Sequence, residues 1–189
     1  MQDRIRSIIE SSMAVQQQAM ERNVAVIEKI AKTSISCLKN GGTLFFFGNG
    51  GSAADSQHVA AEFIGRFQKE RRALAAMALT TDTSVLTCLA NDYSYDIVFS
   101  RQLEAYGKKG DMAFGISTSG KSPNVLKAFA AAKAMGITRV AFTGGDGGSA
   151  AIAADMSIIV PSKVTARIQE AHITIFHAIC EVVEDAFVA

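Results

Sequence analysis

Three side chains of this sequence are suited to acid–base chemistry at neutral pH or to metal binding. His58 and Glu62 are four residues apart in a segment with a helical pattern, so they would share one face of a helix. His177 lies in a second helical segment near the end of the chain. An imidazole and a carboxylate can exchange protons with a substrate, and i, i+4 spacing also suits a divalent metal ion. Two ligands do not complete a metal site, and a lone histidine on an apolar face, such as His177 or His172, is more often part of the core.

A glycine-rich segment precedes His58 and is typical of an anion site. Residues 48–52 read Gly-Asn-Gly-Gly-Ser and join an apolar run to the start of a helical segment. Glycine permits positive φ angles and lets a ligand approach the backbone N–H groups, while a helix N-terminus adds a partial positive charge. A plain tight turn, with Ser52 as the helix N-cap, is the alternative interpretation.

The same segment also satisfies a dinucleotide-binding pattern. Gly48, Gly50 and Ala53 fit G-x-G-x-x-A, so a nicotinamide enzyme has to be considered. A chain of 189 residues leaves no room for a second, substrate-binding domain. The acidic residue expected about twenty positions further on is missing, since the nearest candidate, Asp82, is about thirty positions away. We therefore expect no nucleotide cofactor.

A second polar segment strengthens the phosphate interpretation. Residues 117–122 read Ser-Thr-Ser-Gly-Lys-Ser, follow another apolar run and precede Pro123, which suits the first position of a helix. Their four hydroxyls would be neutral donors to a phosphate, and a P-loop is excluded because its G-x-x-x-x-G-K-[ST] pattern is absent. A cluster of helix caps is the alternative, and Lys121 could be an ordinary solvated lysine. Two such segments in one chain predict a bound phosphate group.

The elements that would position these segments alternate along the chain. Helical patterns are expected over residues 1–40, 52–67, 83–90, 96–106, 123–135, 149–154 and 166–187. Short apolar runs between them predict strands over residues 43–47, 73–79, 112–116, 140–143 and 157–160. Five strands separated by helices indicate an α/β fold with a mostly parallel sheet and helices on both faces. In such folds ligands bind at the carboxyl ends of the strands, where both polar segments would lie.

The composition limits the class of protein. With 189 residues, 49% of them apolar, and only two prolines, the chain fits one globular domain over residues 1–189. A formal net charge of +1 gives no field that would attract nucleic acid or an anionic membrane. No apolar stretch approaches the ~20 residues of a membrane span, and the first thirty residues lack a signal-peptide pattern. The three dispersed cysteines predict reduced core thiols, so we expect a cytoplasmic protein without nucleic-acid or membrane partners.

Several motifs, in this order, resemble the phosphoheptose isomerases, a family with the sugar isomerase (SIS) fold. The matching segments span nearly the whole chain and lie at residues 47–58, 61–62, 91–92, 116–120 and 167–170. The family converts D-sedoheptulose 7-phosphate to D-glycero-D-manno-heptose 7-phosphate, the first step of ADP- or GDP-heptose synthesis for surface glycans such as lipopolysaccharide or capsule. The resemblance implies a three-layer αβα sandwich. It also implies that residues 1–40 form an N-terminal helical extension that packs in a homotetramer with active sites at subunit interfaces.

The resemblance also implies roles for individual positions. Glu62 and His177 would be the acid–base pair. One zinc ion per subunit would be held by His58, Glu62, Gln169 and His177. The substrate would contact Asn49, Gly50, Gly51, Ser52, Glu62, Asn91, Asp92, Ser117, Thr118, Ser119, Ser122 and Gln169. Ala166 departs from those members that carry Asp at this position, which puts one polar contact in doubt.

The reaction implied by the resemblance agrees with the chemistry of these residues. Aldose–ketose isomerisation moves a proton between neighbouring carbons through an enediol, which an acid–base pair can do without a redox cofactor. Helix geometry raises a further point, because Gln169 and His177 would be ~12 Å apart along their helix and ~80° apart in direction. One small ion would be hard for both to reach. We therefore hypothesise that these two residues of one copy serve different active sites of the oligomer.

Three other kinds of SIS protein are alternatives. A non-catalytic relative binds the replication initiator of bacteria, but it lacks the acidic residue and the histidine found here as Glu62 and His177. A sugar-phosphate-sensing module usually accompanies a DNA-binding or synthetase domain, and the sequence contains no such domain. An SIS isomerase for a shorter or longer sugar stays open, because loop donors recognise phosphate without counting carbons.

Overall fold

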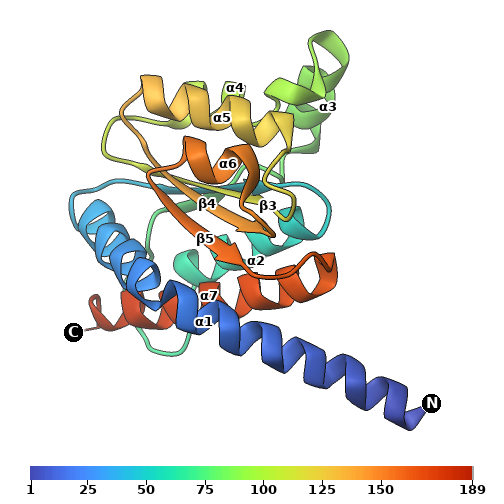
Figure 1. The fold of residues 1–189 in the computed structure, drawn as a ribbon. Helices are drawn as coiled ribbons and strands as arrows, with labels where there is room; N and C mark the ends of the chain where they lie inside the picture. Colours follow the sequence, from blue (N-terminus) through green and yellow to red (C-terminus); the bar gives the residue numbers. More distant parts are fainter. Residues whose placement is uncertain (189) are drawn as a thin grey trace.

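The computed structural model describes residues 1–188 and has a five-stranded sheet between two layers of helices (Figure 1). The strands are β1 Leu44–Gly48, β2 Ala76–Ala78, β3 Met112–Ser117, β4 Thr138–Gly144 and β5 Met156–Val160. They lie in the order β2-β1-β3-β4-β5, and each neighbouring pair is parallel. The predicted α/β fold is confirmed. The strand order reverses between β1 and β3, so the loops after these two strands meet at the topological switch point where ligands of such folds bind.

Helices cover both faces of the sheet (Figure 1). One layer contains α1 Gln2–Lys39, α2 Gly51–Ile64 and α7 Thr165–Asp185, and the other contains α4 Ser100–Tyr106, α5 Pro123–Ala134 and α6 Gly148–Ala153. The helix α3 Thr83–Asp92 lies at the edge of the second layer, next to the short 3₁₀ helix η1 Tyr95–Ile97. The carboxyl ends of β1 and β3 are therefore bordered by α2 and α7 on one side and by α5 on the other.

The apolar run of β1 is buried on both faces of the sheet. Phe46 belongs to the core cluster under α1, α2 and α7, whereas Phe45 and Phe47 belong to the cluster under α4 and α5. Successive side chains of a strand point to opposite faces, so an unbroken apolar run is what a strand covered on both sides requires. The ring of Phe142 in β4 stacks on Phe176 of α7 at 3.9 Å between centroids. Aromatic contacts of this kind hold α7 on the sheet.

The structure corrects the extent of three expected elements. The expected helix over residues 96–106 is interrupted, because the Ser94 hydroxyl accepts the Asp96 N–H to start η1, and Val98 and Phe99 then enter the core before α4 begins. The helix expected over residues 52–67 is α2, which ends at Ile64 with Gly65 as its C-cap. The strand expected over residues 73–79 pairs with β1 over three residues only.

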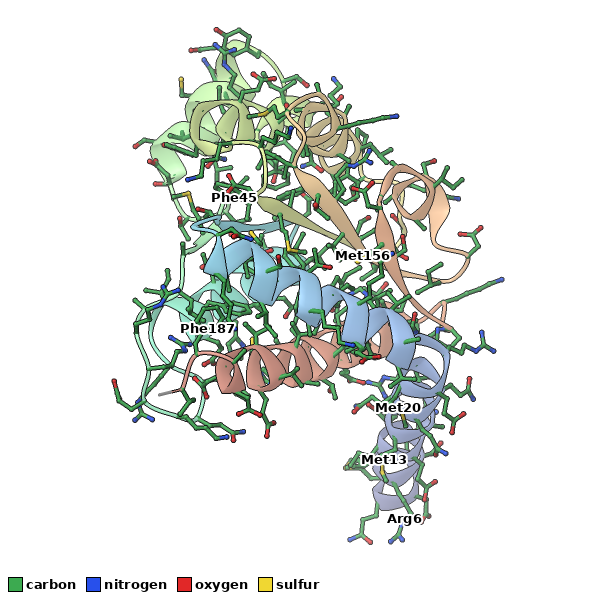
Figure 2. The ribbon with its side chains drawn as sticks, turned by 90° about the vertical axis from the view of Figure 1, so that its left-hand side faces the viewer. Arg6, Met13, Met20, Phe45, Met156 and Phe187 are labelled. Atoms are coloured by element: carbon green, nitrogen blue, oxygen red, sulfur yellow. The ribbon has the colours of Figure 1, made fainter. Side chains whose placement is uncertain are left out.

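The first helix, α1, extends beyond the rest of the molecule. Its second half packs on α7 and β5, and the Asn23 side chain exchanges two hydrogen bonds of 3.2 Å with the backbone of Ile159 in the edge strand. Its first half extends past the body of the molecule (Figure 2) and exposes apolar side chains, namely Ile5, Ile8, Ile9 and Met13. Two hydrogen bonds join this half to α7, since Arg167 donates to the Ile8 carbonyl and Ser12 donates to Glu170. None of the helices in residues 1–188 combines the length and the apolarity that crossing a bilayer requires.

His172 belongs to the core, as expected for a lone histidine on an apolar face. Its Nε2 lies 3.0 Å from the carbonyl oxygen of Thr143, and the residue is fully buried. Burial lowers the pKa of His172 to about 4, although the hydrogen bond to Thr143 opposes this shift. The ring is therefore neutral at physiological pH, and its Nε2 donates to the carbonyl.

Acid should destabilise the fold through His172. Between the ordinary pKa of 6.5 and the folded-state pKa of about 4, the unfolded chain binds a proton at His172 and the folded chain does not. The free energy of unfolding is therefore highest above pH 6.5 and decreases as the pH falls toward 4. Between pH 7 and pH 4.5 this decrease is about 2–3 kcal/mol. Urea unfolding of the wild type and of His172→Gln at both pH values measures it. Equal pH dependence in the two proteins would contradict the prediction.

Candidate active site

The loop between β1 and α2 leaves the start of the helix open to a ligand. The N-cap of α2 is Gly50, with φ of 57°, and no side chain caps the helix. The alternative in which Ser52 is the N-cap is therefore wrong; Ser52 lies in the first helical turn and is buried. A carboxyl-end loop, positive φ at glycine and an uncapped helix start form the arrangement that favours an anion.

In the loop between β3 and α5, the serine hydroxyls lie close together. The Ser117 oxygen lies 2.9 Å from the Ser122 oxygen and 3.5 Å from the Ser119 oxygen. Pro123 occupies the first turn of α5, as predicted, and the Ser122 side chain makes no capping hydrogen bond. The loop is thus more than a set of helix caps. Gly120 closes it with φ of 63°, and a Cβ at this position would overlap the carbonyl of Gly147.

A pair of amides, which the sequence did not reveal, joins the two loops. Asn49 Nδ2 donates to Asn124 Oδ1 at 3.0 Å, and Asn124 Nδ2 donates to Asn49 Oδ1 at 2.8 Å. Asn124 lies in the first turn of α5 and is almost fully buried. Its only signal in the sequence is its place directly after the hydroxyl-rich segment and Pro123. The reciprocal pair fixes the spacing of the two loops.

Substitution of Asn124 by Ala should weaken binding of a phosphorylated ligand. The variant leaves the Asn49 amide without its partner and lets the loops move apart, so we expect the Kd for inorganic phosphate or the KM for a sugar phosphate to rise by about 10-fold. Calorimetric titration of phosphate measures the effect. Asn40→Ala, at the exposed C-cap of α1 and at the other end of β1 from both loops, makes the same chemical change and is the control. Unchanged affinity in Asn124→Ala would show that the pair does not set the loop spacing.

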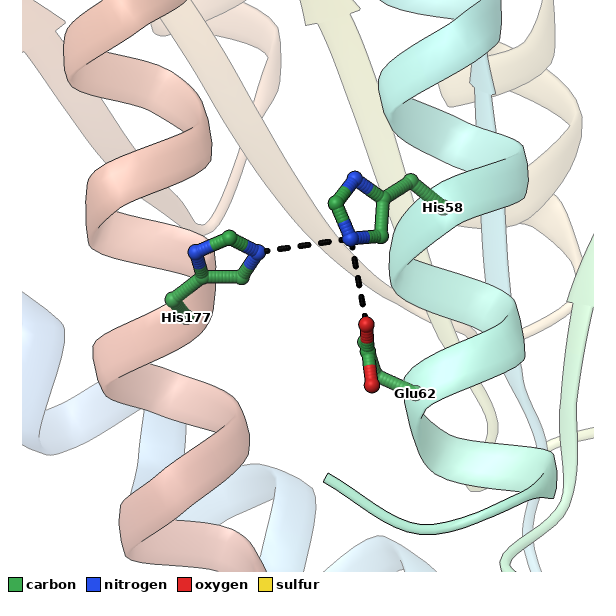
Figure 3. Close-up of side chains that lie close together, drawn as sticks. All are labelled: His58, Glu62 and His177. Atoms are coloured by element: carbon green, nitrogen blue, oxygen red, sulfur yellow. Dashed lines mark hydrogen bonds and ion pairs between the residues drawn. The ribbon is translucent and has the colours of Figure 1, made fainter. Parts of the chain in front are cut away.

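Figure 3 shows that His58, Glu62 and His177 meet between α2 and α7. His58 Nε2 lies 3.1 Å from Glu62 Oε1 and 3.5 Å from His177 Nε2. The His58 side chain is 47% exposed and that of Glu62 is 23% exposed, so solvent and small molecules reach the group. His177 is half-buried and packs against Phe67, at 5.4 Å between ring centroids. We call these three residues the triad.

The triad has the geometry of a metal site. Its donor atoms all lie within 4.8 Å of one another. A tetrahedral zinc ion with bonds of about 2.0–2.2 Å places neighbouring ligand atoms about 3.3 Å apart, close to the two separations observed here. Two imidazole nitrogens and one carboxylate oxygen are also a ligand set that zinc accepts with an open fourth position. These three residues therefore fit the zinc ion that the resemblance implied, three of whose four expected ligands they supply.

Gln169 is not part of the triad. Its side-chain amide lies directly against Gly51 at the start of α2, where any Cβ would overlap it. His177 lies eight residues, or ~12 Å, further along α7, next to His58, which is seven residues after Gly51. The helices α2 and α7 thus run side by side, with Gln169 at the phosphate loop and His177 at the triad. One ion does not contact both in this chain, but the two ends of one elongated ligand could.

Asn91 and Asp92 lie apart from the loops and the triad. They end α3, and the Asn91 amide donates to Asp92 at 2.8 Å, while the Cys88 thiol contacts Asp92 at 3.5 Å. No hydrogen bond within residues 1–188 connects them to the other candidate residues. Figure 1 shows α3 at the periphery of the molecule. If these residues contact a substrate, that substrate lies outside the helical layer and not between the loops and the triad of the same chain.

A cavity of about 780 Å³ opens beside the hydroxyl-rich loop. Thr118 and Ser119 line it together with Arg22 of α1, Lys163 and Ile168. The triad does not line this cavity. We place the candidate active site along α2 and α7 because the residues with acid–base and metal-binding groups converge there and not in the cavity.

Known proteins resemble this chain in sequence and in fold. The chain matches the SIS domain family over residues 9–144. A protein of a Roseiflexus strain, named phosphoheptose isomerase, is 51% identical over 93% of this chain and 89% of its own. One of Paramagnetospirillum magneticum with the same name is 57% identical over 83% of this chain and 82% of its own. The solved structure of phosphoheptose isomerase from Neisseria gonorrhoeae superimposes with a TM-score of 0.92 and 44% identity, covering 97% of this chain and 98% of that one.

Proposed function

Because the chain belongs to the phosphoheptose isomerase family of SIS-domain proteins, we propose that it converts D-sedoheptulose 7-phosphate to D-glycero-D-manno-heptose 7-phosphate. The observation that carries the proposal is the distance between the phosphate loops and the triad. Gly51 and His58 are about 10 Å apart along α2. In this substrate the phosphate and the reacting carbons are at opposite ends of a seven-carbon chain. A phosphate held at Gly51 therefore leaves the reacting end near Glu62 and His177, which favours a long sugar phosphate over a short one.

The proposed acid–base pair would act on neighbouring carbons. The Glu62 carboxylate removes a proton from C1 of the ketose, and the electron pair forms the C1–C2 double bond of an enediol. The His177 imidazole donates a proton to the C2 oxygen. Glu62 then returns its proton to C2, while His177 takes the proton of the C1 hydroxyl and the aldehyde forms. Each residue ends in its starting state, and each proton transfer contributes about 10²–10⁴-fold.

The phosphate loops and Gln169 would bind and orient the sugar phosphate. The open start of α2 and the hydroxyls after β3 bind the phosphate, and the energy of that remote contact holds the other end of the sugar at the triad. The side-chain amide of Gln169, next to Gly51, would donate a hydrogen bond to the sugar phosphate. One zinc ion per subunit would be held by His58, Glu62 and His177, and when bound it would polarise the carbonyl and hydroxyl oxygens of the sugar in place of the His177 proton.

The assembly and the pathway are part of the same proposal. Exposed apolar residues on the projecting half of α1 support a homotetramer in which α1 packs on other copies. Asn91 and Asp92 at the periphery support active sites completed by a neighbouring subunit. The thiols of Cys37, Cys88 and Cys180 are free, which supports a reducing compartment such as the cytoplasm. The product would enter the synthesis of heptose for surface glycans.

A coupled isomerase assay with D-sedoheptulose 7-phosphate tests the proposed function. We expect turnover by the wild type, and loss of most of it after treatment with a chelator, with recovery when zinc is restored. Absence of turnover under all these conditions would contradict the enzyme assignment and favour the non-catalytic relative that binds the replication initiator. Turnover that a chelator leaves unchanged would remove zinc from the reaction, and acid–base catalysis by the triad would remain.

A further inference from the structure

The segment that follows α2, residues 65–73, is tied to the end of α7 by a buried carboxylate. Glu184 Oε1 accepts the N–H of Phe67 at 2.7 Å, and Glu184 Oε2 accepts those of Gln68 and Lys69, each at 2.7 Å. Only 2% of the Glu184 side chain is exposed. Burial alone would raise the pKa of this carboxyl, but the three N–H groups and Arg71 lower it below its ordinary value. Glu184 is therefore ionised at neutral pH, and its hydrogen bonds hold the segment against α7.

Arg71 ties the same segment to the end of α2. Its Nη2 donates to the carbonyl of Glu62 at 2.7 Å, and its Nη1 donates to the carbonyls of Phe63 and Gly65 at 2.9 and 2.8 Å. Glu62 and Phe63 belong to the last turn of α2, whose carbonyls have no partner within the helix, and a positive charge is also favourable there. The Arg71 side chain is 1% exposed, and its Nε lies 3.4 Å from Glu184 Oε1. One buried ion pair thus joins α2, the segment and α7.

Both ends of this connection reach the triad. Arg71 binds the backbone of Glu62 itself, and the segment held by Glu184 carries Phe67, whose ring packs on His177. Glu184 follows His177 by seven residues, so the two side chains lie on one face of α7, about 10 Å apart. The three residues of the triad come from two helices, and these contacts fix the position of one helix relative to the other.

We propose that Arg71 and Glu184 are positioning residues that set the distance between Glu62 and His177. Groups that transfer protons or bind a metal have to be held within about 0.5 Å of their working geometry, and loss of such supporting contacts typically costs about 10–100-fold in activity or metal affinity. The effect on catalysis rests on the proposed function, whereas the effect on the geometry of the triad does not. A purely structural ion pair would change stability and leave both unchanged.

The variant Glu184→Gln tests the proposal, with Asp185→Asn as the matched control. Asp185 is the next residue of α7 and pairs with Lys69 of the same segment at 2.6 Å, but both side chains are more than half exposed. Each substitution replaces one carboxylate by its amide. Surface pairs of this kind contribute little. In Glu184→Gln, by contrast, the new amide would meet three N–H groups with one oxygen that accepts and one nitrogen that does not.

The test has three readouts: kcat and KM, zinc affinity measured by competition with a chromophoric chelator, and the imidazole NMR signals of His58 and His177. For folded Glu184→Gln we expect a kcat lower by about 10–100-fold, a similar loss of zinc affinity and shifted His177 signals. KM for the sugar phosphate should stay within about twofold, because the phosphate loops lie at the other end of α2. Asp185→Asn should match the wild type in all three.

Several outcomes would overturn the proposal. One is a Glu184→Gln protein with lower unfolding stability but wild-type kcat, zinc affinity and His177 signals. Another is an equal effect of Asp185→Asn. If Glu184→Gln does not fold, Arg71→Lys is used, because lysine keeps the charge but lacks the fork that binds three carbonyls. If the wild type fails to turn over the sugar phosphate, the proposed function fails, and the His177 signals alone decide the positioning role.

Discussion

Replacement of Glu62 by Gln is expected to lower kcat by about 10²–10⁴-fold while changing the affinity for the sugar phosphate little. The amide cannot remove the proton from C1, because it is not a base at accessible pH. It also replaces the oxygen that lies 3.1 Å from His58, so a metal at the triad would be held less tightly. The phosphate contacts begin at Gly51, about 16 Å away along α2, and should be unaffected. The coupled assay gives kcat and KM, and phosphate titration gives the binding term separately.

A matched control separates this loss from a general effect of removing one negative charge. Glu70→Gln makes the same chemical change in the segment after α2, where the carboxylate is 90% exposed and lies 3.8 Å from Arg66. We expect its kcat to equal that of the wild type. A Glu62→Gln protein with more than a tenth of the wild-type kcat would exclude Glu62 as the catalytic base. An equal loss of kcat in both variants would show that removal of a negative charge, and not loss of proton transfer, lowers the activity.

The parts of the site that depend on local sequence were predictable. The apolar run that ends at Phe47 indicated a strand buried on both faces, and parallel strands place the loops that follow them at one edge of the sheet. The spacing of His58 and Glu62 already predicted a shared helical face. The resemblance to the phosphoheptose isomerases then supplied the family, which the comparisons confirm. These features follow from periodicity, glycine positions and short motifs.

The rest of the site depends on contacts between distant parts of the chain. His177 meets His58 across 119 positions, and the apolar residues around His177 were more typical of a core histidine. Asn124 pairs with Asn49 across 75 positions, and Glu184 binds the N–H groups of a loop more than a hundred positions earlier. No periodic pattern connects such residues, because their partners are set by the packing of α2, α5 and α7. Gln169 and His177 were correctly expected to be far apart along their helix. That Gln169 lies next to Gly51, and His177 next to His58, was known only from the structure.

That placement changes what mixed oligomers should show. Gln169 lies at Gly51 and His177 lies at His58, at two places along the neighbouring helices α2 and α7 of the same chain, so both can serve one elongated substrate. The hypothesis that they serve different sites is then unnecessary. Co-expressed Gln169→Ala and His177→Ala chains should recover no activity above either variant alone, because every site would carry one of the two defects. Recovery in this mixture would restore the hypothesis of sharing.

The opposite result is expected for the residues at the end of α3. Within residues 1–188, the hydrogen bonds of the Asp92 side chain go to Asn91 and Cys88, at the periphery of the molecule (Figure 1), and we propose that Asp92 binds the substrate of a neighbouring subunit. Chains with Asp92→Ala and chains with Glu62→Ala, each inactive alone, should then regain up to about a quarter of the wild-type activity when co-expressed, since random mixing gives one site in four both intact residues. The isomerase assay on purified mixed oligomers measures this recovery. If the mixture stays inactive although both subunits are present, Asp92 acts on the site of its own chain and the interfacial arrangement is wrong.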